Sequence, residues 1–233
     1  MSSLPPRSIR SVLVTGAEGA LGQEVARRFR KGGVQVIGLH HGALDTEARL
    51  AADLWIQADL ADSAQVRAAV NRAETEGHGI DALIHCAGGF RYAAIDQASD
   101  EDIDFLIHSN LKSSFYILRE ILPGMKKRGF GRIVLISSRA TLQGDAGMGV
   151  YAATKAGLNA LVGSVAQEVK AFDININAVL PTVIDTSANR QAMPGADPSA
   201  WVKREELAEI LFSLTQPFGK PLNGALIPVS GRL

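Results

Sequence analysis

Short apolar segments alternate with longer amphipathic segments over almost the whole chain. Seven short runs rich in Val, Ile and Leu are expected to be buried strands: residues 11–16, 34–39, 54–59, 81–88, 131–138, 174–181 and 224–230. Between them, apolar residues recur at helical spacing over 20–31, 62–75, 101–127, 151–170 and 203–215. Strands that are apolar on both faces and separated by helices are typical of a parallel sheet covered on both sides. The pattern predicts an α/β chain with a doubly wound Rossmann fold and a mainly parallel seven-stranded sheet.

No repeat or linker divides the pattern, so we expect one domain over residues 1–233. Residues 1–9 are polar and contain two prolines, which predicts a flexible start. The least regular stretch is 182–201, which contains Pro194, Gly195 and Pro198 and follows a strand. Ligands of open α/β sheets bind at the carboxyl ends of the strands. We therefore expect 182–201 to be a loop or a broken helix that contacts the substrate.

Composition limits the function. Of the 233 residues, 46% are hydrophobic, enough for a large core, and Lys plus Arg balances Asp plus Glu at 24 each. No net charge favours nucleic acid or an anionic membrane. The single cysteine, Cys86, excludes an intrachain disulfide and a cysteine-rich zinc site. With no secretory signal and no long apolar run, we expect a cytoplasmic protein with a small-molecule substrate and no metal, nucleic-acid or membrane partner.

The first predicted strand runs directly into a glycine-rich turn and an amphipathic helix. Gly16, Gly19 and Gly22 permit a tight turn, and the N–H groups of the helix start can bind a pyrophosphate. We assign this turn, with Glu18, Ala20 and Leu21, to a dinucleotide. The alternative is an ordinary strand-to-helix turn without a ligand.

The ends of the second and third strands are expected to contact the adenosine part of the dinucleotide. An NAD site usually has an acidic residue at the end of the second strand, where this chain has His40. This difference slightly favours NADP over NAD, although Glu18 is acidic and residues 40–42 include no Arg or Lys. Both histidines at 40–41 could also form a solvated turn. Asp59, followed by Leu60, could bind the adenine amino group or cap the helix that starts near Ser63.

Tyr151 and Lys155 are four residues apart in a predicted helix, so their side chains share one face. A tyrosine pKa of about 10 is too high for ready proton exchange near neutral pH. A nearby ammonium favours the phenolate, so we expect Lys155 to lower the pKa of Tyr151 and make it a general acid/base. The alternative is an ordinary exposed helix face.

Several motifs in order resemble the short-chain dehydrogenase/reductase family: the glycine turn, "CAGG" at 86–89, Asn110, "ISS" at 136–138 and "YAATK" at 151–155. The resemblance implies that Tyr151 is the general acid/base and that Lys155 binds the nicotinamide ribose. It also implies that Ser138 orients the substrate oxygen and that Asn110 supports a proton-relay water. Ser137 could compete for the role of Ser138.

The resemblance extends to further cofactor contacts and to assembly. It implies that the cofactor is also contacted by Cys86, Ala87, Gly88, Pro181, Val183, Ile184 and Thr186, the last at the carboxamide. A homodimer or homotetramer through 101–127 and 151–170 is implied as well. Three residues depart from the usual family pattern: Ala20, Cys86 and Thr182.

These departures and the segment 182–201 resemble one subgroup, the dihydropteridine reductases, which reduce quinonoid dihydropterins. His40 and Ser138 differ from that subgroup, and Ser138 would suit an ordinary carbonyl substrate. Phe90, Met193 and Trp201 could form an apolar wall of the substrate site, or pack as core or lid. The main hypothesis is an NAD(P)H-dependent reductase of a carbonyl or imine-like substrate. The alternatives are a dihydropteridine reductase and a dinucleotide-binding redox sensor without turnover; a methyltransferase would share the glycine turn but would not need Tyr-x-x-x-Lys.

Overall fold

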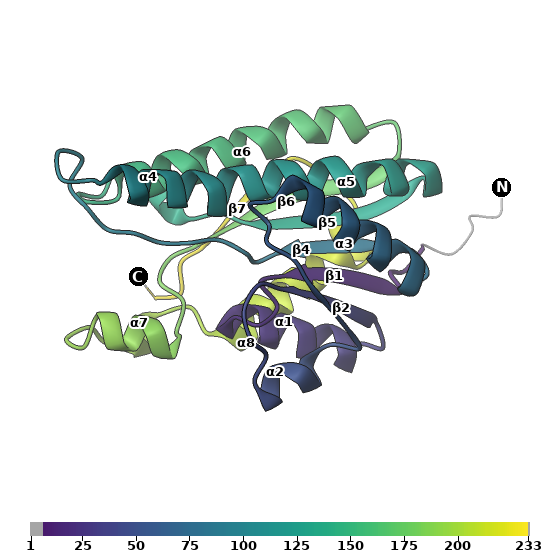
Figure 1. Ribbon diagram of the computed structural model, residues 1–233, viewed down its shortest axis with the longest axis horizontal. Coiled ribbons are helices and arrows are strands. Elements are labelled where there is room, and N and C mark those ends of the chain that lie inside the picture. Colours follow the sequence, from purple (N-terminus) through teal and green to yellow (C-terminus); the bar gives the residue numbers. More distant parts are fainter. Residues whose placement is uncertain (1–6, 233) are drawn as a thin grey trace.

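One seven-stranded parallel sheet forms the centre of the computed structural model, which describes residues 7–232 (Figure 1). The strand order is β3-β2-β1-β4-β5-β6-β7, and every neighbouring pair is parallel. The strands are β1 Ser11–Thr15, β2 Gln35–His40, β3 Leu54–Gln57, β4 Ala82–His85, β5 Phe130–Ile136, β6 Asp173–Pro181 and β7 Leu226–Val229. The predicted fold class is therefore confirmed, and the sheet is entirely parallel rather than mainly so.

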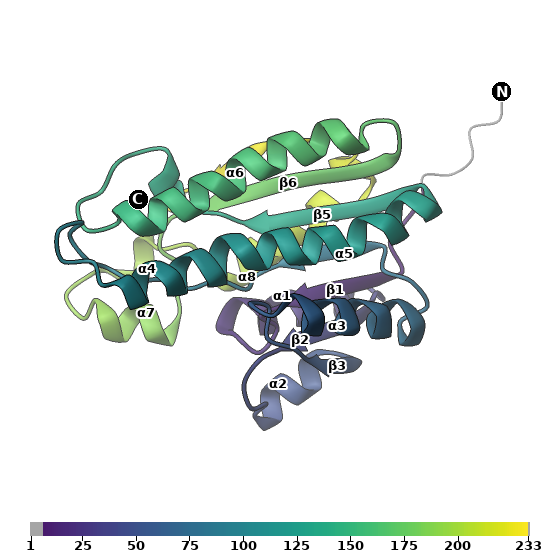
Figure 2. The same cartoon turned by 45° about the horizontal axis from the view of Figure 1, so that its top comes forward.

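Helices cover both faces of this sheet. One hydrophobic core lies under α3, α5 and α6, and the other under α1 and α8. Figure 2 shows the first group in front of the sheet. The helices are α1 Ala20–Lys31, α2 Thr46–Ala51, α3 Ser63–Glu76, α4 Asp100–Leu106, α5 Ser113–Arg128, α6 Gly149–Val169, α7 Ser187–Ala192 and α8 Arg204–Thr215. The central strands β1, β4 and β5 are fully buried, as apolar runs between two helical layers must be.

Two helices differ from the sequence-based expectation. The predicted helix 101–127 is interrupted by a π-helical segment, Ile107–Lys112, between α4 and α5. The short α2 was not predicted; the Asp45 carboxylate caps it by accepting a hydrogen bond from Ala48 N. Segment 182–201 is a broken helix, with α7 followed by a single 3₁₀ turn, Pro198–Ala200.

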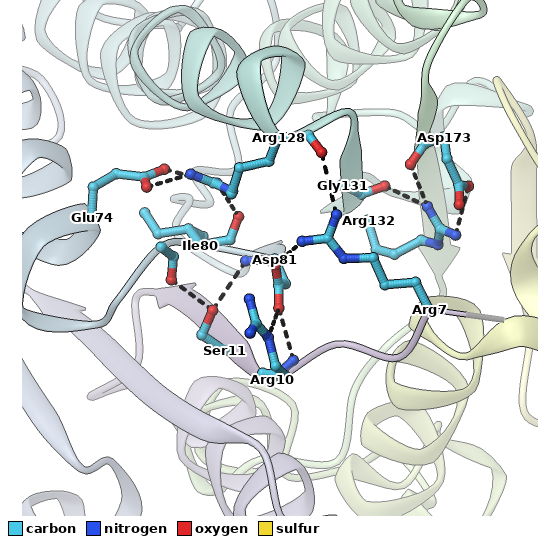
Figure 3. A network of polar contacts seen from close by, with 11 residues as sticks. Arg7, Arg10, Ser11, Glu74, Ile80, Asp81, Arg128, Gly131, Arg132 and Asp173 are labelled. Atoms are coloured by element: carbon cyan, nitrogen blue, oxygen red, sulfur yellow. Dashed lines mark hydrogen bonds and ion pairs between the residues drawn. The ribbon is translucent and has the colours of Figure 1, made fainter. Parts of the chain in front are cut away.

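The amino edge of the sheet is held by an ionic network (Figure 3). The Asp81 carboxylate, which is 2% exposed, accepts hydrogen bonds from Arg10 N and Arg10 Nε and lies 3.7 Å from Arg7 Nη2. Arg132, which is also buried, donates to the Asp173 carboxylate. Arg128 binds Glu74 and the Ile80 carbonyl. Four arginines thus join the chain start to α3, α5 and the strand ends at this edge.

Of the segment 1–9, for which flexibility was expected, residues 1–6 lie outside the described residues. Ile9 is 6% exposed and belongs to the core under α1. Arg7 donates to the Arg128 carbonyl and its guanidinium lies over the Phe130 ring. From Arg7 onward, the described chain is therefore packed against the sheet.

Candidate active site

The glycine turn packs tightly against the segment that follows β4. Gly16 has φ +60°, which L side chains rarely adopt, and a Cβ there would lie 2.9 Å from Ala87 N. α1 starts directly after this turn with Gly19 at its N-cap, so backbone N–H groups at the helix start are free of a side-chain cap. The strand order reverses between β1 and β4, which is where open α/β sheets bind ligands.

A cavity of about 380 Å³ opens at this reversal point. It brings together seven of the residues predicted to bind the cofactor: Gly16, Glu18, His40, Asp59, Leu60, Ala87 and Gly88. Its lining also contains eight residues that sequence reasoning missed: Leu39, His41, Ala58, Ala61, Phe105, His108, Ser109 and Ser113. Four of the eight come from α4, the π-helical segment and the start of α5, whose position over the sheet only the folded chain reveals.

The ends of β2 and β3 form the far side of the cavity. His40 lines the cavity at the position where many NAD sites have a carboxylate. Its ring lies edge-on to Trp55, and its Nδ1 is 2.7 Å from the Gly42 carbonyl oxygen. The Glu18 carboxylate reaches this place from the glycine turn and accepts a hydrogen bond of 3.0 Å from His41 N. The end of β2 is therefore next to an acid that is distant in sequence.

Asp59 lines the same cavity and does not cap α3. The cap is Asp62, whose carboxylate accepts from Ala64 N and Gln65 N. The Asp59 carboxylate accepts from Ala61 N, which fixes the turn after β3. Of the two roles considered for Asp59, capping of α3 is therefore performed by Asp62.

Tyr151 lies near the start of α6, beside the end of β5. Burial raises the pKa of Tyr151, and a hydrogen bond with the Ser138 side chain partly offsets that rise. Ser138 follows β5 at the head of a 3₁₀ turn, where its Oγ also accepts from Ala140 N. Ser137 points elsewhere, with its Oγ 3.4 Å from the Lys155 carbonyl oxygen. The two serines therefore have different contacts, and Ser138 is the one that affects the pKa of Tyr151.

For Lys155, the helical spacing predicts a lowered pKa of Tyr151, whereas burial raises that pKa in the structure. Lys155 Nζ lies 6.0 Å from the centre of the tyrosine ring and donates to the Ile136 carbonyl at 2.8 Å. The side chain is buried, and the loss of solvation lowers the pKa of Lys155 to about 8. Burial has the largest effect on the pKa of Tyr151 and raises it, and the contact with Ser138 lowers it by a smaller amount.

Asn110 lies in the π-helical segment with no solvent exposure. Its Oδ1 accepts from Gly89 N at 2.9 Å, and its Nδ2 donates to the Gly89 carbonyl and to Thr154 Oγ1. A Cβ on Gly88 would lie 2.7 Å from that Oδ1 and 3.2 Å from Lys155 Nζ. Asn110 thus joins the segment after β4 to α6 and brings the glycines of "CAGG" against Lys155.

Comparisons with known proteins agree with this geometry. Residues 10–196 match the family model described as short chain dehydrogenase. The chain belongs to the short-chain dehydrogenase family. It is 36% identical over 222 residues to oxidoreductase UcpA of Salmonella typhimurium, with 89% of this chain and 83% of that protein covered. It is 29% identical over 245 residues to acetoacetyl-CoA reductase of Allochromatium vinosum, with 96% and 98% covered.

A solved short-chain dehydrogenase/reductase from Serratia marcescens BCRC 10948 has the same fold. It superposes with a TM-score of 0.88 at 26% identity, covering 96% of this chain and 97% of that one. These three relatives carry names other than dihydropteridine reductase. As a short-chain dehydrogenase, the protein is an NAD(P)-dependent oxidoreductase.

The structure of this short-chain dehydrogenase accommodates a nicotinamide dinucleotide. The cradle at Gly16 and Gly88 has room only for residues without a Cβ, and α1, which has no side-chain cap, begins directly after the turn that lines the cavity. Gly16, Ala87 and Gly88 would hold the dinucleotide backbone, and Lys155 lies beside Gly88. Leu21 is partly buried against the core under α1, and Ala20 starts that helix.

Two ionisable residues lie at the end of β4 and directly after it. Cys86 carries a thiol whose pKa is raised to about 12 by burial, so it remains protonated. His85, which no sequence motif singles out, is 1% exposed, and burial lowers its pKa to about 3. Its Nδ1 is 2.8 Å from Thr15 Oγ1 and its Nε2 is 3.4 Å from Ser113 Oγ. A neutral imidazole therefore links β1, β4 and α5.

The segment after β6 is tied to the start of α8. Pro181 ends the strand, and Ile184 pairs with Val202 in an isolated parallel bridge. The Val183 carbonyl accepts from Val202 N. Thr186 Oγ1 accepts from Asn189 N as the N-cap of α7, so the predicted carboxamide contact competes with a capping role for its acceptor.

The three residues considered for an apolar wall lie in different surroundings, and Trp201 follows the alternative of core packing. Trp201 is 4% exposed and belongs to the core, because the bridge beside Val202 draws it inward. Phe90 is 49% exposed and lies edge-on to the Tyr151 ring, with centroids 5.0 Å apart. Met193 is 36% exposed at the end of α7. Phe90 is thus the residue of the three that contacts the tyrosine.

Within residues 7–232, no helix is long and apolar enough to cross a bilayer. The same residues contain no cluster of three or more His, Cys, Asp or Glu side chains suited to a metal ion.

Proposed function

We propose that this oxidoreductase reduces a carbonyl or imine-like substrate with NAD(P)H, with Tyr151 as the proton donor. The observation that carries the proposal is the position of Lys155, whose Nζ lies 6.0 Å from the centre of the Tyr151 ring and beside Gly88 of the dinucleotide cavity. The nicotinamide cofactor, when bound, supplies the hydride.

The raised pKa of Tyr151 keeps the phenol protonated at neutral pH, so it carries the proton to be donated, although it is a weaker acid than a free tyrosine. A phenol that stays protonated at neutral pH can give its proton to the oxygen or nitrogen on which negative charge develops. The Ser138 hydroxyl, which follows β5, would donate its single hydrogen to the same substrate atom. Lys155 then serves to bind the ribose hydroxyls and to re-protonate the tyrosine, rather than to keep it ionised.

Asn110 acts as a positioning residue in this proposal. The amide groups bound to Gly89 and Thr154 fix the segment after β4 against α6. Both hydrogens of the Asn110 amide are used by these contacts, so a relay water could only donate to its Oδ1.

The substrate would approach between Phe90, Ser138 and α7. The exposed Phe90 ring beside Tyr151 favours a substrate with an apolar or planar part near its reacting atom. Acetoacetyl-CoA reductase, one of the relatives, is named for a keto substrate. A keto group needs the donor that Ser138 provides, which supports a carbonyl substrate for this chain.

A dihydropteridine reductase is the second candidate, because the sequence of segment 182–201 resembles that subgroup. A non-catalytic redox sensor is the third, and it would bind dinucleotide without turnover. We also propose that the chain associates as a homodimer or homotetramer through α4, α5 and α6, where Phe105 and Phe115 are exposed at 36% and 45%.

The decisive test compares wild type, Tyr151→Phe and the control Tyr116→Phe, whose ring packs on the core under α5. NADH and NADPH oxidation would be followed with simple ketones, aldehydes and a quinonoid dihydropterin. We expect Tyr151→Phe to bind cofactor normally and to lose about 10²–10⁴-fold in kcat. The active substrate decides between the two enzymes, and full activity of Tyr151→Phe would refute the proton-donor role.

A further inference from the structure

The acidic group beside the end of β2 comes from the glycine turn after β1 and not from β2 itself. Dinucleotide sites that select NAD carry a carboxylate at the end of the second strand, where it binds the 2′-hydroxyl of the adenosine ribose. Here that strand ends in His40, and the carboxylate of Glu18 lies beside it instead.

The Glu18 side chain is held in a defined orientation. Its Oε1 accepts from His41 N at 3.0 Å, and the carbonyl oxygen of the same residue accepts from Gln23 Nε2. His41 is fixed in turn, because its carbonyl oxygen accepts from Gln57 Nε2. The carboxylate therefore stands between the glycine turn and the two strand ends β2 and β3.

The second carboxylate oxygen has no partner. Within the described residues, Glu18 Oε2 is shielded from solvent and makes no hydrogen bond, although Glu18 lines the cavity. An unpaired carboxylate oxygen shielded from water is costly unless a ligand donates to it. A ribose hydroxyl is such a donor, whereas a phosphate at the same position is only an acceptor near neutral pH.

The charges around the cavity also favour a ribose hydroxyl over a phosphate. Its described lining includes two carboxylates, Glu18 and Asp59, and no Arg or Lys. NADP differs from NAD only by the phosphate on the 2′-oxygen of that ribose. The two carboxylates repel this added negative charge, and their effect on the rest of the molecule is the same for both cofactors. The 2′-phosphate would also lack the guanidinium partner that such groups usually have.

We infer that Glu18 recognises the adenosine ribose diol through its carboxylate and makes the enzyme select NAD(H) over NADP(H). The inference rests on the proposed function, since it concerns the cofactor of that reaction. It reverses the slight preference for NADP that the sequence alone suggested from His40.

The test is the equilibrium Kd of NADH and of NADPH, measured by quenching of protein fluorescence and repeated by calorimetry. The variants are Glu18→Gln, which keeps an oxygen for His41 N but removes the charge, and Glu18→Asp, which keeps the charge and shortens the reach. Glu47→Gln is the matched control, because its side chain is 83% exposed on α2 and does not line the cavity. Thermal melting of each variant shows that it is folded.

We expect wild type and Glu47→Gln to bind NADH at least roughly tenfold more tightly than NADPH, the size of effect that one charged hydrogen bond supports. Glu18→Gln should reduce this ratio by about tenfold, by weakening NADH and strengthening NADPH. Glu18→Asp should lie between the two.

Three results would overturn the inference: a wild type that prefers NADPH, an unchanged ratio in a folded Glu18→Gln, or an equal change of ratio in Glu47→Gln. These results leave the proposed reductase intact, because Tyr151→Phe tests the chemistry independently of cofactor type. Failure of wild type to bind either nucleotide would refute both proposals together.

Discussion

His85 is the buried ionisable residue in this site to which the proposed chemistry gives no direct role. Its two ring nitrogens face hydroxyl groups of Thr15 and Ser113, and the positive charge of Lys155 adds to the effect of burial in lowering its pKa. Ser113 Oγ donates its hydrogen to the Ser109 carbonyl oxygen, so it accepts from His85 Nε2–H, and in the neutral ring Nδ1 accepts from the Thr15 hydroxyl. The imidazole therefore serves as an uncharged link under the cavity floor, and it is stable there only while it is unprotonated.

This predicts a defined acid sensitivity. The pKa of His85 falls from 6.5 in the unfolded chain to about 3 in the fold, so between these values the unfolded chain binds a proton that the folded chain does not. Stability is therefore lost as the pH falls from about 6.5 towards 3. Between pH 7 and pH 4.5, His85 should account for about 2–3 kcal/mol of the decrease in the free energy of unfolding.

Urea unfolding of wild type, His85→Asn and His78→Asn at both pH values measures this contribution. His78 is exposed and has φ 55°, a conformation that asparagine tolerates, so it controls for the substitution itself. His85→Asn should lose less stability on acidification than wild type, whatever its stability at pH 7. Parallel pH dependence in wild type and His85→Asn would show that another group is responsible.

Among the helices, the π-helical segment between α4 and α5 has the clearest functional consequence. Its extra residue per turn turns Asn110 inward, toward Gly89 and α6. The same region supplies Phe105, His108 and Ser109 to the cavity lining. One local irregularity thus serves both the cofactor side and the tyrosine side of the site.

Asn110→Ala should therefore affect catalysis through position. The variant leaves the partly buried N–H and C=O of Gly89 without their Asn110 partners, which costs about 1–3 kcal/mol of stability. We expect a lower melting temperature and a lower kcat with a substrate that wild type turns over, with a shifted pH profile because Lys155 is no longer held against Gly88. Asn71→Ala on the exposed face of α3 should change neither quantity. A lower melting temperature with an unchanged pH profile would reduce Asn110 to a stabilising role.

The sequence predicted the elements better than it predicted the contacts between them. Helix 20–31 and the strand positions follow from apolar periodicity, which is a local property. α2 was missed because six residues carry too little periodicity, and the π segment because 101–127 reads as one continuous amphipathic pattern. The reach of Glu18 to His41 and the burial of Tyr151 depend on the packing of segments that are distant in the chain.

At the scale of the whole molecule, the two edges of the sheet have different tasks. The carboxyl edge holds the cavity and the candidate catalytic residues, while the amino edge holds the arginine network of Figure 3. Because Asp81 begins the turn into β4 and binds the chain start, the network joins the first strand to the centre of the sheet.

Asp81→Ala should therefore lower stability without changing the site. The backbone N–H of Arg10 loses its acceptor, and the partly exposed arginines lose a buried carboxylate, for a total of about 1–3 kcal/mol. The Kd for dinucleotide should remain as in wild type. Denaturant unfolding and cofactor titration check both statements, with the exposed Asp96→Ala as control. A changed Kd in a folded variant would show that the two edges are coupled.

The protonated state of the single cysteine has a practical consequence. Because the Cys86 thiol keeps its proton up to a pH of about 12, maleimide and iodoacetamide reagents, which need the thiolate, should pass it by at neutral pH. One cysteine introduced on α7 would then accept a fluorophore selectively in the otherwise natural chain. Energy transfer from such a label could report the movement of segment 182–201 in real time as substrate enters and product leaves.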